Sequence, residues 1–509
     1  MTDGIPVSDE ETEAVAEGDE SETSILAKVA REGGLAFGAG IFSKGVGFVF
    51  QVLLARFLGP SGYGLYVLGW TVTNYVQPII LLGLPDGLVR FIPGYLADDR
   101  PGAIRGLVYA AVAFALGLSL VATAVIYTFA GTIAGRVFQT PAFASVLRVF
   151  ALTIPFYVLM RITTATAVGF QQVRYQQAII NVLFPLLKVT TIGAVFFAGF
   201  RLTGSVYGLL FAVFLSALAG VVLLPRVFSD ISVTGSTEFE LARLFRYSLP
   251  LFLVGFSELA LNQTDRLILG ALTASAEVGL YNAAYVLSQQ TLLFFTALMT
   301  IFNPVVSDLY NTEQFDELET VYESVTRWIL VVSLPVVVVG VIFAPEMLTI
   351  FNEQFASGSS LLLLLFAAQL IFVSVGPARE LLVMTDYQDL ILIDTVAMLV
   401  INIAMNLVLV PRFGAAGAAF ATVLTIAVVQ SVQVYQAARY VGVFPFDRAY
   451  LRVVVTGLPF AVLGCAAWYF PLGFVPRVGV AVIGAGAYAV VIWTYAVTTE
   501  DVQILRNVR

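Results

Sequence analysis

Fourteen long runs of apolar residues dominate this 509-residue chain. Each run holds about 20 mostly apolar residues, the length that an α-helix needs to cross the ~30 Å hydrocarbon core of a membrane. The runs are continuous rather than alternating, which excludes a transmembrane β-barrel. They lie at residues 35–57, 64–88, 107–129, 146–170, 176–198, 205–224, 247–271, 279–303, 328–350, 359–384, 389–410, 416–438, 453–470 and 476–496. The sequence therefore predicts an all-α integral membrane protein with fourteen transmembrane helices.

Composition supports this fold class and excludes several kinds of function. Only 12% of the residues are charged, about half the fraction found in soluble domains. A net charge of −8 provides no basic surface for nucleic acid, and a single cysteine excludes a disulfide scaffold. The absence of histidine removes imidazole metal sites, Ser-His hydrolases and imidazole proton relays. We therefore expect no catalytic site, no metal site and no cofactor.

The negative charge is concentrated at the N-terminus. Residues 1–24 hold nine acids and no base, whereas the rest of the chain holds 25 acids and 26 bases. Because this segment has few large apolar groups, its composition predicts an acidic, disordered cytoplasmic tail. Three lysines against 23 arginines, together with the acidic tail, favour a salt-loving source such as a haloarchaeon.

The positions of lysine and arginine predict the orientation in the cell membrane. With the N-terminus inside, fifteen of these residues lie in cytoplasmic segments and seven in outer segments. Cytoplasmic loops carry the excess of positive charge, so we expect both termini in the cytoplasm. In the long connection 225–246, Thr237 and Glu240 have the spacing of a capping box, which predicts an amphipathic helix on the membrane surface.

The chain also resembles itself at an offset near 210. Three sets of residues recur in order: 56–66 at 266–281, 174–177 at 386–389, and Gly204 with Gly208 at Gly414 with Gly417. The alternative explanation is that membrane spans share such residues by composition alone. A true repeat predicts two lobes of six helices, related by a pseudo-twofold axis along the membrane normal, with the substrate path between them. The predicted units are the N-terminal lobe 25–224, the linker 225–246, the C-terminal lobe 247–440 and a segment 441–509 with two extra helices.

Charged residues inside membrane spans are expensive and indicate a water-filled cavity or a charged partner. The first half carries bases without acids: Lys44, Arg161 and Lys188, with Arg90 just beyond the second span. Unpaired bases facing one another would bind an anion such as a phosphate. We therefore expect Lys44, Arg161 and Lys188 to line a shared cavity, and Arg90 to be a further candidate.

The second half carries both signs of charge. Arg379 is a further candidate for the cavity, and four acids are candidates for charge partners or ion coupling: Glu258, Asp265, Glu380 and Asp394. Glu258 and Asp265 are seven residues apart and so share one helix face. The alternative to a cationic cavity is a set of interlobe salt bridges that pair Lys44 or Lys188 with Glu258 or Asp394.

Several motifs resemble those of a known family. Residues 51–66, which include Arg56-Phe57-Leu58-Gly59 and Tyr63-Gly64-Leu65-Tyr66, resemble the opening of the polysaccharide biosynthesis flippases. These are the Wzx-like branch of the multidrug/oligosaccharidyl-lipid/polysaccharide exporter superfamily. Residues 83–91 continue the pattern and residues 411–419 match a second stretch, so the resemblance extends from about residue 33 to the end.

The resemblance implies a transporter and not an enzyme. Its implied function is to move a lipid-linked oligosaccharide, of the polyprenyl or dolichyl phosphate type, from the cytoplasmic to the outer leaflet by alternating access. The implied partners are this substrate, membrane lipids and Na⁺ or H⁺ as a coupling ion, and the product serves assembly of cell-surface polysaccharide or glycoprotein glycans.

Two other functions compete with this one. A cation-coupled small-molecule exporter of the same fold is the first alternative, but the first span offers Lys44 where multidrug exporters often use an acid. A membrane glycosyltransferase or glycan ligase is the second. It would need a catalytic acid motif and a sizeable external domain, and the sequence has neither.

Overall fold

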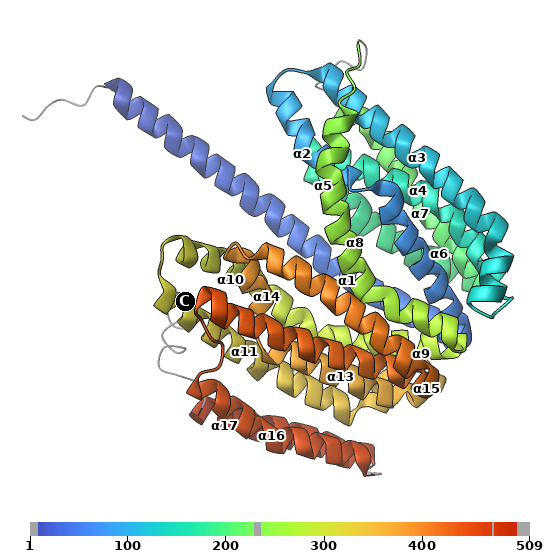
Figure 1. The fold of residues 1–509 in the computed structure, drawn as a ribbon, viewed down its shortest axis with the longest axis vertical. Coiled ribbons are helices and arrows are strands. Elements are labelled where there is room, and N and C mark those ends of the chain that lie inside the picture. The colour runs from blue at the N-terminus through green and yellow to red at the C-terminus, as the bar shows by residue number, and fades with distance from the viewer. Residues whose placement is uncertain (1–8, 229–235, 471–472, 496–509) are drawn as a thin grey trace, which may run out of the picture.

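The computed structural model describes residues 9–228, 236–470 and 473–495, and every regular element in these ranges is a helix (Figure 1). The first half contains α1 Asp9–Leu81, α2 Leu84–Ala97, α3 Pro101–Thr132, η1 Ile133–Val137, α4 Phe143–Gly169, α5 Val173–Gln176, η2 Gln177–Leu183, α6 Phe184–Phe197 and α7 Leu202–Val227. The second half contains α8 Leu241–Leu272, α9 Ser275–Ser288, η3 Gln289–Leu292, α10 Leu293–Asn311, α11 Phe315–Ile342, α12 Ala344–Thr349, η4 Glu353–Gly358, α13 Ser359–Ser374, α14 Ala378–Met384, α15 Gln388–Gln436 and η5 Ala437–Val441, and α16 Arg448–Tyr469 and α17 Phe474–Tyr495 follow it.

Twelve helical stretches in the described ranges are long and apolar enough to cross a membrane. Ten of the fourteen expected spans each correspond to one of these stretches. The other four lie in pairs inside the continuous stretches Gly38–Ala97 and Gln388–Val441. Both stretches break at a glycine with left-handed backbone angles, Gly59 with φ 65° in α1 and Gly414 with φ 56° in α15. Glycine adopts such angles without strain, so the chain reverses there with almost no loop.

The helices gather into two groups (Figure 1). The first group consists of α2 to α7 around the second part of α1, with α4 in contact with α3 and α7. The second group consists of α9 to α15, in which α15 packs against α13 and α14. The helices α16 and α17 pack on α11 at the edge of the second group.

The turns between helices recur along the chain at a nearly constant interval. Three pairs of residues with left-handed backbone angles are 214 or 215 residues apart: Asp99 and Glu313, Gln171 and Asp386, and Gly199 and Gly414. The hydrogen bonds repeat as well, because Arg100 N donates to Tyr95 O and Gln314 N donates to Leu309 O. This interval is close to the offset near 210 in the sequence.

The two helix groups meet where α1 crosses α9. A Cβ added to Gly64 would lie 1.7 Å from the carbonyl oxygen of Ser275, and one added to Gly279 would lie 2.1 Å from the carbonyl oxygen of Pro60. Gly64 and Gly279 are 215 residues apart, as are Pro60 and Ser275. The contact is therefore reciprocal, and only glycine permits so close an approach of the two backbones.

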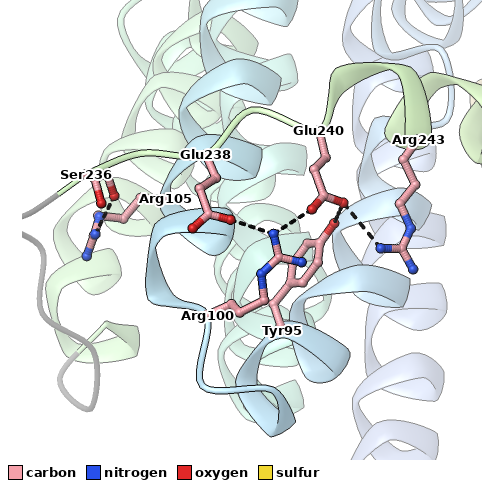
Figure 2. Close-up of polar contacts among 7 residues, drawn as sticks. All are labelled: Tyr95, Arg100, Arg105, Ser236, Glu238, Glu240 and Arg243. Atoms are coloured by element: carbon pink, nitrogen blue, oxygen red, sulfur yellow. Dashed lines mark hydrogen bonds and ion pairs between the residues drawn. The ribbon is translucent and has the colours of Figure 1, made fainter.

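The segment that leads into α8 is fastened to the α2–α3 turn by a network of charges (Figure 2). Arg100 forms ion pairs with Glu238 and with Glu240, the second at 2.7 Å. The hydroxyl of Tyr95 donates to Glu240 at 2.6 Å, and Arg243 pairs with the same carboxylate at 3.2 Å. The Tyr95 hydroxyl and then the two guanidinium groups lower the pKa of Glu240 to about 2.

Backbone contacts reinforce the network. Glu238 N donates to Gly102 O at 3.0 Å, and Arg105 donates to the carbonyl oxygen of Ser236 at 2.7 Å. A Cβ added to Gly106 would lie 1.9 Å from the carbonyl oxygen of Glu238. We call the segment 236–243 the strap. Its backbone packs closely against α3 at Gly102 and Gly106, where a side chain would not fit.

The beginning of α8 packs against the first group and not only the second. Leu244 and Ser248 are buried, and the Cβ positions of Gly87 and Gly83 lie 2.4 Å from Leu244 Cδ1 and 2.3 Å from the Ser248 carbonyl oxygen. Further along, α8 packs against α15. The helix therefore passes from one group to the other (Figure 1).

One expectation about the start of a helix needs correction. Glu240 is the N-cap residue of α8 and not the fourth residue of a capping box with Thr237, because Tyr95 and Arg100 bind its side chain. The helix from Leu241 continues into the apolar span, so residues 236–240 form no separate amphipathic helix. At the N-terminus, α1 begins at Asp9 and includes residues 9–24, and the disorder of the acidic tail stays a prediction. Glutamate and alanine, which are frequent there, favour a helix.

Candidate functional site

Three cavities adjoin one another, the first between the two helix groups and the other two among helices of the second half. The first has a volume of about 430 Å³, the second about 360 Å³ and the third about 350 Å³. The first and second share Gln289 and Leu292, the first and third share Thr296, and the second and third share Arg379 and Glu380. The three cavities therefore adjoin one another through shared lining residues.

The first cavity brings together two of the bases that the sequence singles out. Lys44 of α1 and Lys188 of α6 both line it. The ammonium group of Lys188 lies between two aromatic rings, 5.0 Å from the centre of Phe50 and 4.7 Å from that of Phe184. Each ring attracts the cation through its electron-rich face. No carboxylate of the described residues lies within ion-pair distance of either lysine.

Gln51 adds a donor to the same cavity wall. The Tyr63 hydroxyl donates to Gln51 Oε1 at 3.0 Å, and Asn282 donates to that hydroxyl at 2.6 Å. Because its oxygen is engaged, Gln51 offers its N–H groups to the cavity that it lines. The wall formed by Lys44, Lys188 and Gln51 is therefore rich in hydrogen-bond donors, as binding of an anion requires.

The other predicted bases of the first half lie elsewhere. Arg161 is half-buried on α4 and lines none of the three cavities, and Arg90 is exposed on α2. Three glutamines that were not predicted from the sequence line the first cavity, whereas Arg161 does not: Gln51, Gln289 and Gln290. Their only signal in the sequence is that they are amides inside apolar spans.

The second cavity is lined by Arg379 and by three of the predicted acids, Glu258, Asp265 and Glu380. Arg379 of α14 pairs with Glu258 of α8 at 2.5 Å and approaches Glu380 to 4.0 Å. The guanidinium is thus balanced by acids of the second half of the chain, one on α8 and one on α14. The expected alternative of interlobe pairs between Lys44 or Lys188 and Glu258 or Asp394 does not occur among the described residues.

Asp265 is the most enclosed acid of this cavity. Its carboxylate accepts hydrogen bonds from Asn406 at 2.8 Å, from the Tyr281 hydroxyl at 2.8 Å and from the Thr422 hydroxyl at 2.9 Å. These donors come from α15 and α9, and Asn402 beside them lines the cavity. All three donors are neutral groups, and no ion pair with this carboxyl is found among the described residues.

Asp394 completes the set of predicted acids. It is buried on α15 and lines none of the three cavities, although its neighbour Thr395 does. Gln436 donates to its carboxylate at 3.0 Å. No group of three or more histidine, cysteine or acidic residues within the described ranges could hold a metal ion.

Two family models match the chain. The model described as "Polysaccharide biosynthesis protein" matches residues 29–310, which is more than half of the chain, and the model described as "MatE" matches residues 250–408. The first contains Lys44, Gln51 and Lys188, and the second contains the acids that line the second cavity, Glu258, Asp265 and Glu380.

Curated relatives match parts of the chain. A probable low-salt glycan biosynthesis flippase, Agl15, of Haloferax volcanii is 28% identical over 43% of this chain and 47% of its own length. A probable flippase, AglR, of the same organism is 26% identical over 39% of this chain and 41% of its own length. The chain thus spans less than half the length of these relatives in the matched regions. Their source agrees with the haloarchaeal origin that composition predicts.

A solved structure shows the fold. The lipid II flippase MurJ in an inward closed conformation has a TM-score of 0.68 to this chain, at 14% identity. The superposition covers 90% of this chain and 99% of that one. With twelve apolar helical stretches on the same scaffold, this is a multi-pass membrane protein.

Proposed function

Because the chain belongs to the polysaccharide biosynthesis protein family, in the Wzx-like branch of the multidrug/oligosaccharidyl-lipid/polysaccharide exporter superfamily, we propose that it is a flippase for a lipid-linked oligosaccharide. It moves this substrate from the cytoplasmic to the outer leaflet of the cell membrane. The observation that carries the proposal is the donor-rich wall of Lys44, Lys188 and Gln51 in a cavity between the two helix groups.

The chemistry of the wall suits the phosphate that joins lipid and sugar. A phosphate brings negative charge and acceptor oxygens, and it meets two cations and an amide donor with no carboxylate paired to them. Lys44 is exposed to the cavity, so it can bind a phosphate that keeps part of its water. Glutamines along the cavity can hydrogen-bond to sugar hydroxyls, while the lipid tail stays in the bilayer.

Alternating access would let the cavity open to each side of the membrane in turn. The recurring turns support two lobes related by a pseudo-twofold axis, and the two breaks at Gly59 and Gly414 support a total of fourteen spans. The reciprocal contact of Gly64 with Gly279 would then close one end of the path. With both termini in the cytoplasm, as the positive charges predict, that closed end faces outward.

A cation gradient can drive the cycle through the acidic cavity. Asp265 of α8 accepts hydrogen bonds from neutral donors, and its carboxyl is where a Na⁺ or H⁺ would bind. Substrate and ion would thus bind in adjoining cavities. The match of residues 250–408 to the MatE model favours a second candidate function, a cation-coupled exporter of small molecules.

Transport of labelled substrate separates the two functions. The full chain is reconstituted in liposomes with a fluorescent polyprenyl-phosphate oligosaccharide in one leaflet, and its appearance in the other leaflet is measured. We expect transport by the wild type, little or none by Lys44→Ala, and partial transport by Lys44→Arg, because charge matters more than shape for a hydrated phosphate.

The matched control is Arg90→Ala, which removes an exposed arginine outside the three cavities and should leave transport unchanged. Efflux of small organic cations without movement of the labelled lipid would support the exporter and overturn the flippase.

A further inference from the structure

Asp394 is a buried carboxylate without a cation beside it. Only 5% of the residue is exposed, and within the described part of the chain its one hydrogen-bond partner is Gln436, whose Nε2 donates to Oδ1 at 3.0 Å. Gln433, one helical turn before Gln436 on α15, is only 4% exposed. An isolated ionised carboxylate in such surroundings is costly, and it becomes stable when it is paired, bound to a cation or protonated.

Two oxygen atoms at this place have no hydrogen-bond partner. Asp394 Oδ2 and Gln436 Oε1 are both buried and unsatisfied within the described part of the chain. Both are acceptors, so they cannot bond to each other while the carboxyl is ionised. A proton on Oδ2 changes this. The acid and the amide can then form a closed pair, with Nε2–H donating to Oδ1 and Oδ2–H donating to Oε1.

No other charged group competes for this position. The elements packed against α15 carry these ionisable side chains: Arg243, Arg246, Tyr247, Glu258, Asp265 and Arg266 of α8, Glu277, Tyr281 and Tyr285 of α9, Arg379 and Glu380 of α14, and Arg439 and Tyr440 of η5, while α13 carries none. Glu258 and Glu380 lie beside Arg379, and Asp265 is bonded by the neutral donors around it. Glu277 of α9 binds Ala415 N, and the guanidinium of Arg266 lies over the Tyr285 ring. None of these groups forms an ion pair with Asp394 among the described residues.

A polar route connects the carboxyl to the central space. Thr395, the residue after Asp394, lines the second cavity, and so do Gln430 and Gln433, which precede Gln436 on α15. Water in that cavity can therefore deliver a proton to the carboxyl or receive one from it. A metal cation is a poorer fit, because it would find two unpaired oxygens here and hard cations take about six or more.

We propose that Asp394 and Gln436 form a proton-binding site of the second helix group, distinct from the Asp265 cluster. A proton passes from cavity water to Oδ2, the carboxylate becomes a neutral acid, and the reverse transfer restores the ion and the water. No other bond is made or broken. As a coupling group the site rests on the proposed transport function, but its proton binding is a property of the protein without substrate.

Infrared difference spectroscopy of the full chain in lipid nanodiscs, without substrate, tests the site. Spectra at about pH 6 and about pH 8, between which exposed carboxyls stay ionised, should differ by the carbonyl band of protonated Asp394. The chain has no histidine, so imidazole adds nothing between about pH 5 and pH 8. Asp394→Asn should lose this band and remain folded, because its amide reproduces the pairing of the protonated acid with Gln436.

The matched control is Asp389→Asn, which removes an exposed carboxyl from the same helix and should keep the band. Persistence of the band in Asp394→Asn, or its absence from the wild type at every pH, overturns the proposal. A change of the Asp394 carboxylate bands by sodium at fixed pH would also overturn it, in favour of a metal site.

Transport is measured separately. If the site couples to transport, a pH gradient should stimulate the wild type and Asp389→Asn several-fold but should leave Asp394→Asn unchanged. A wild type that moves no lipid-linked sugar yet shows the band would refute the flippase and leave the proton site standing.

Discussion

The ammonium group of Lys188 lies at the wall of the first cavity, and no carboxylate of the described residues is within ion-pair distance of it. The rings of Phe50 and Phe184 hold its ammonium group, and each such contact contributes about 0.5–2 kcal/mol when water is excluded. We predict that Lys188→Ala weakens binding of inorganic pyrophosphate about tenfold, which is about 1.4 kcal/mol. Lys188→Arg should bind nearly as well, because a guanidinium also stacks on aromatic rings. Isothermal titration calorimetry of the full chain in nanodiscs measures both.

The control for this prediction is Arg161→Ala. It removes a base of the same half that lines none of the three cavities, so its affinity for pyrophosphate should equal that of the wild type. Equal binding by Lys188→Ala and the wild type would contradict an anion site at this wall.

At the scale of elements, the strap ties the connection between the two helix groups to the first group. The Tyr95 hydroxyl and two arginines hold the pKa of Glu240 at about 2, below its ordinary value of 4.5. A carboxyl with a lowered pKa stabilises the docked strap in full above pH 4.5, and this contribution is lost as the pH falls through about 2. We predict that a spin label at exposed Phe239 stays immobile down to about pH 3 and becomes mobile below it.

Two variants distinguish the contribution of the strap's ion pairs from that of its backbone contact with α3. Glu240→Gln should make the label mobile at neutral pH, because the ion pairs with Arg100 and Arg243 are gone. Gly106→Val should do the same at any pH, since its side chain would collide with the Glu238 carbonyl 1.9 Å away from the Cβ. Both measurements use a background without the exposed native Cys465. A label that stays immobile in both variants would mean that the strap is held by α8 alone.

The strap shows why membrane spans could be predicted from the sequence whereas the start of a helix could not. Apolar length locates the spans because the cost of crossing a membrane depends on it. The end of a helix depends instead on partners distant in the chain. Thr237 and Glu240 have the right spacing for a capping box, yet Glu240 bonds to Tyr95, which is 145 residues away. Local spacing carries no information on such a competitor.

For the whole molecule, the sequence indicates which residues are charged in the membrane but not which way they face. Lys44 and Lys188 meet at one cavity and Arg161 does not, because the rotation of α4 is set by its packing against α3 and α7. The apolar residues of α4 are spread around the whole helix, so no polar stripe predicts that rotation. Arg379 and Glu258 pair across 121 residues, and only the assembled fold brings them together.

Two glycines at equivalent positions in the two halves, Gly64 and Gly279, allow the close contact between the helix groups. At Gly64 an added Cβ would lie 1.7 Å from a backbone oxygen, and backbone cannot move aside as a side chain can. Gly64→Val should therefore force α1 and α9 apart at a cost of about 1–3 kcal/mol. In a protein without Cys465, a cysteine at buried Val278 should react slowly with a membrane-impermeant maleimide, and Gly64→Val should make it react fast.

Gly279→Val should have the same effect as Gly64→Val, because each glycine faces the backbone that precedes the other. That equality follows only if the two halves meet as a reciprocal pair, so it tests the pseudo-twofold relation as well as the contact. Gly117→Val is the control, since no atom lies within 4 Å of its Cβ position, and it should leave the cysteine protected. Fast labelling by one of the two variants and not the other would show a contact that is close but not symmetric. Slow labelling in both folded variants would mean that the helices separate elsewhere.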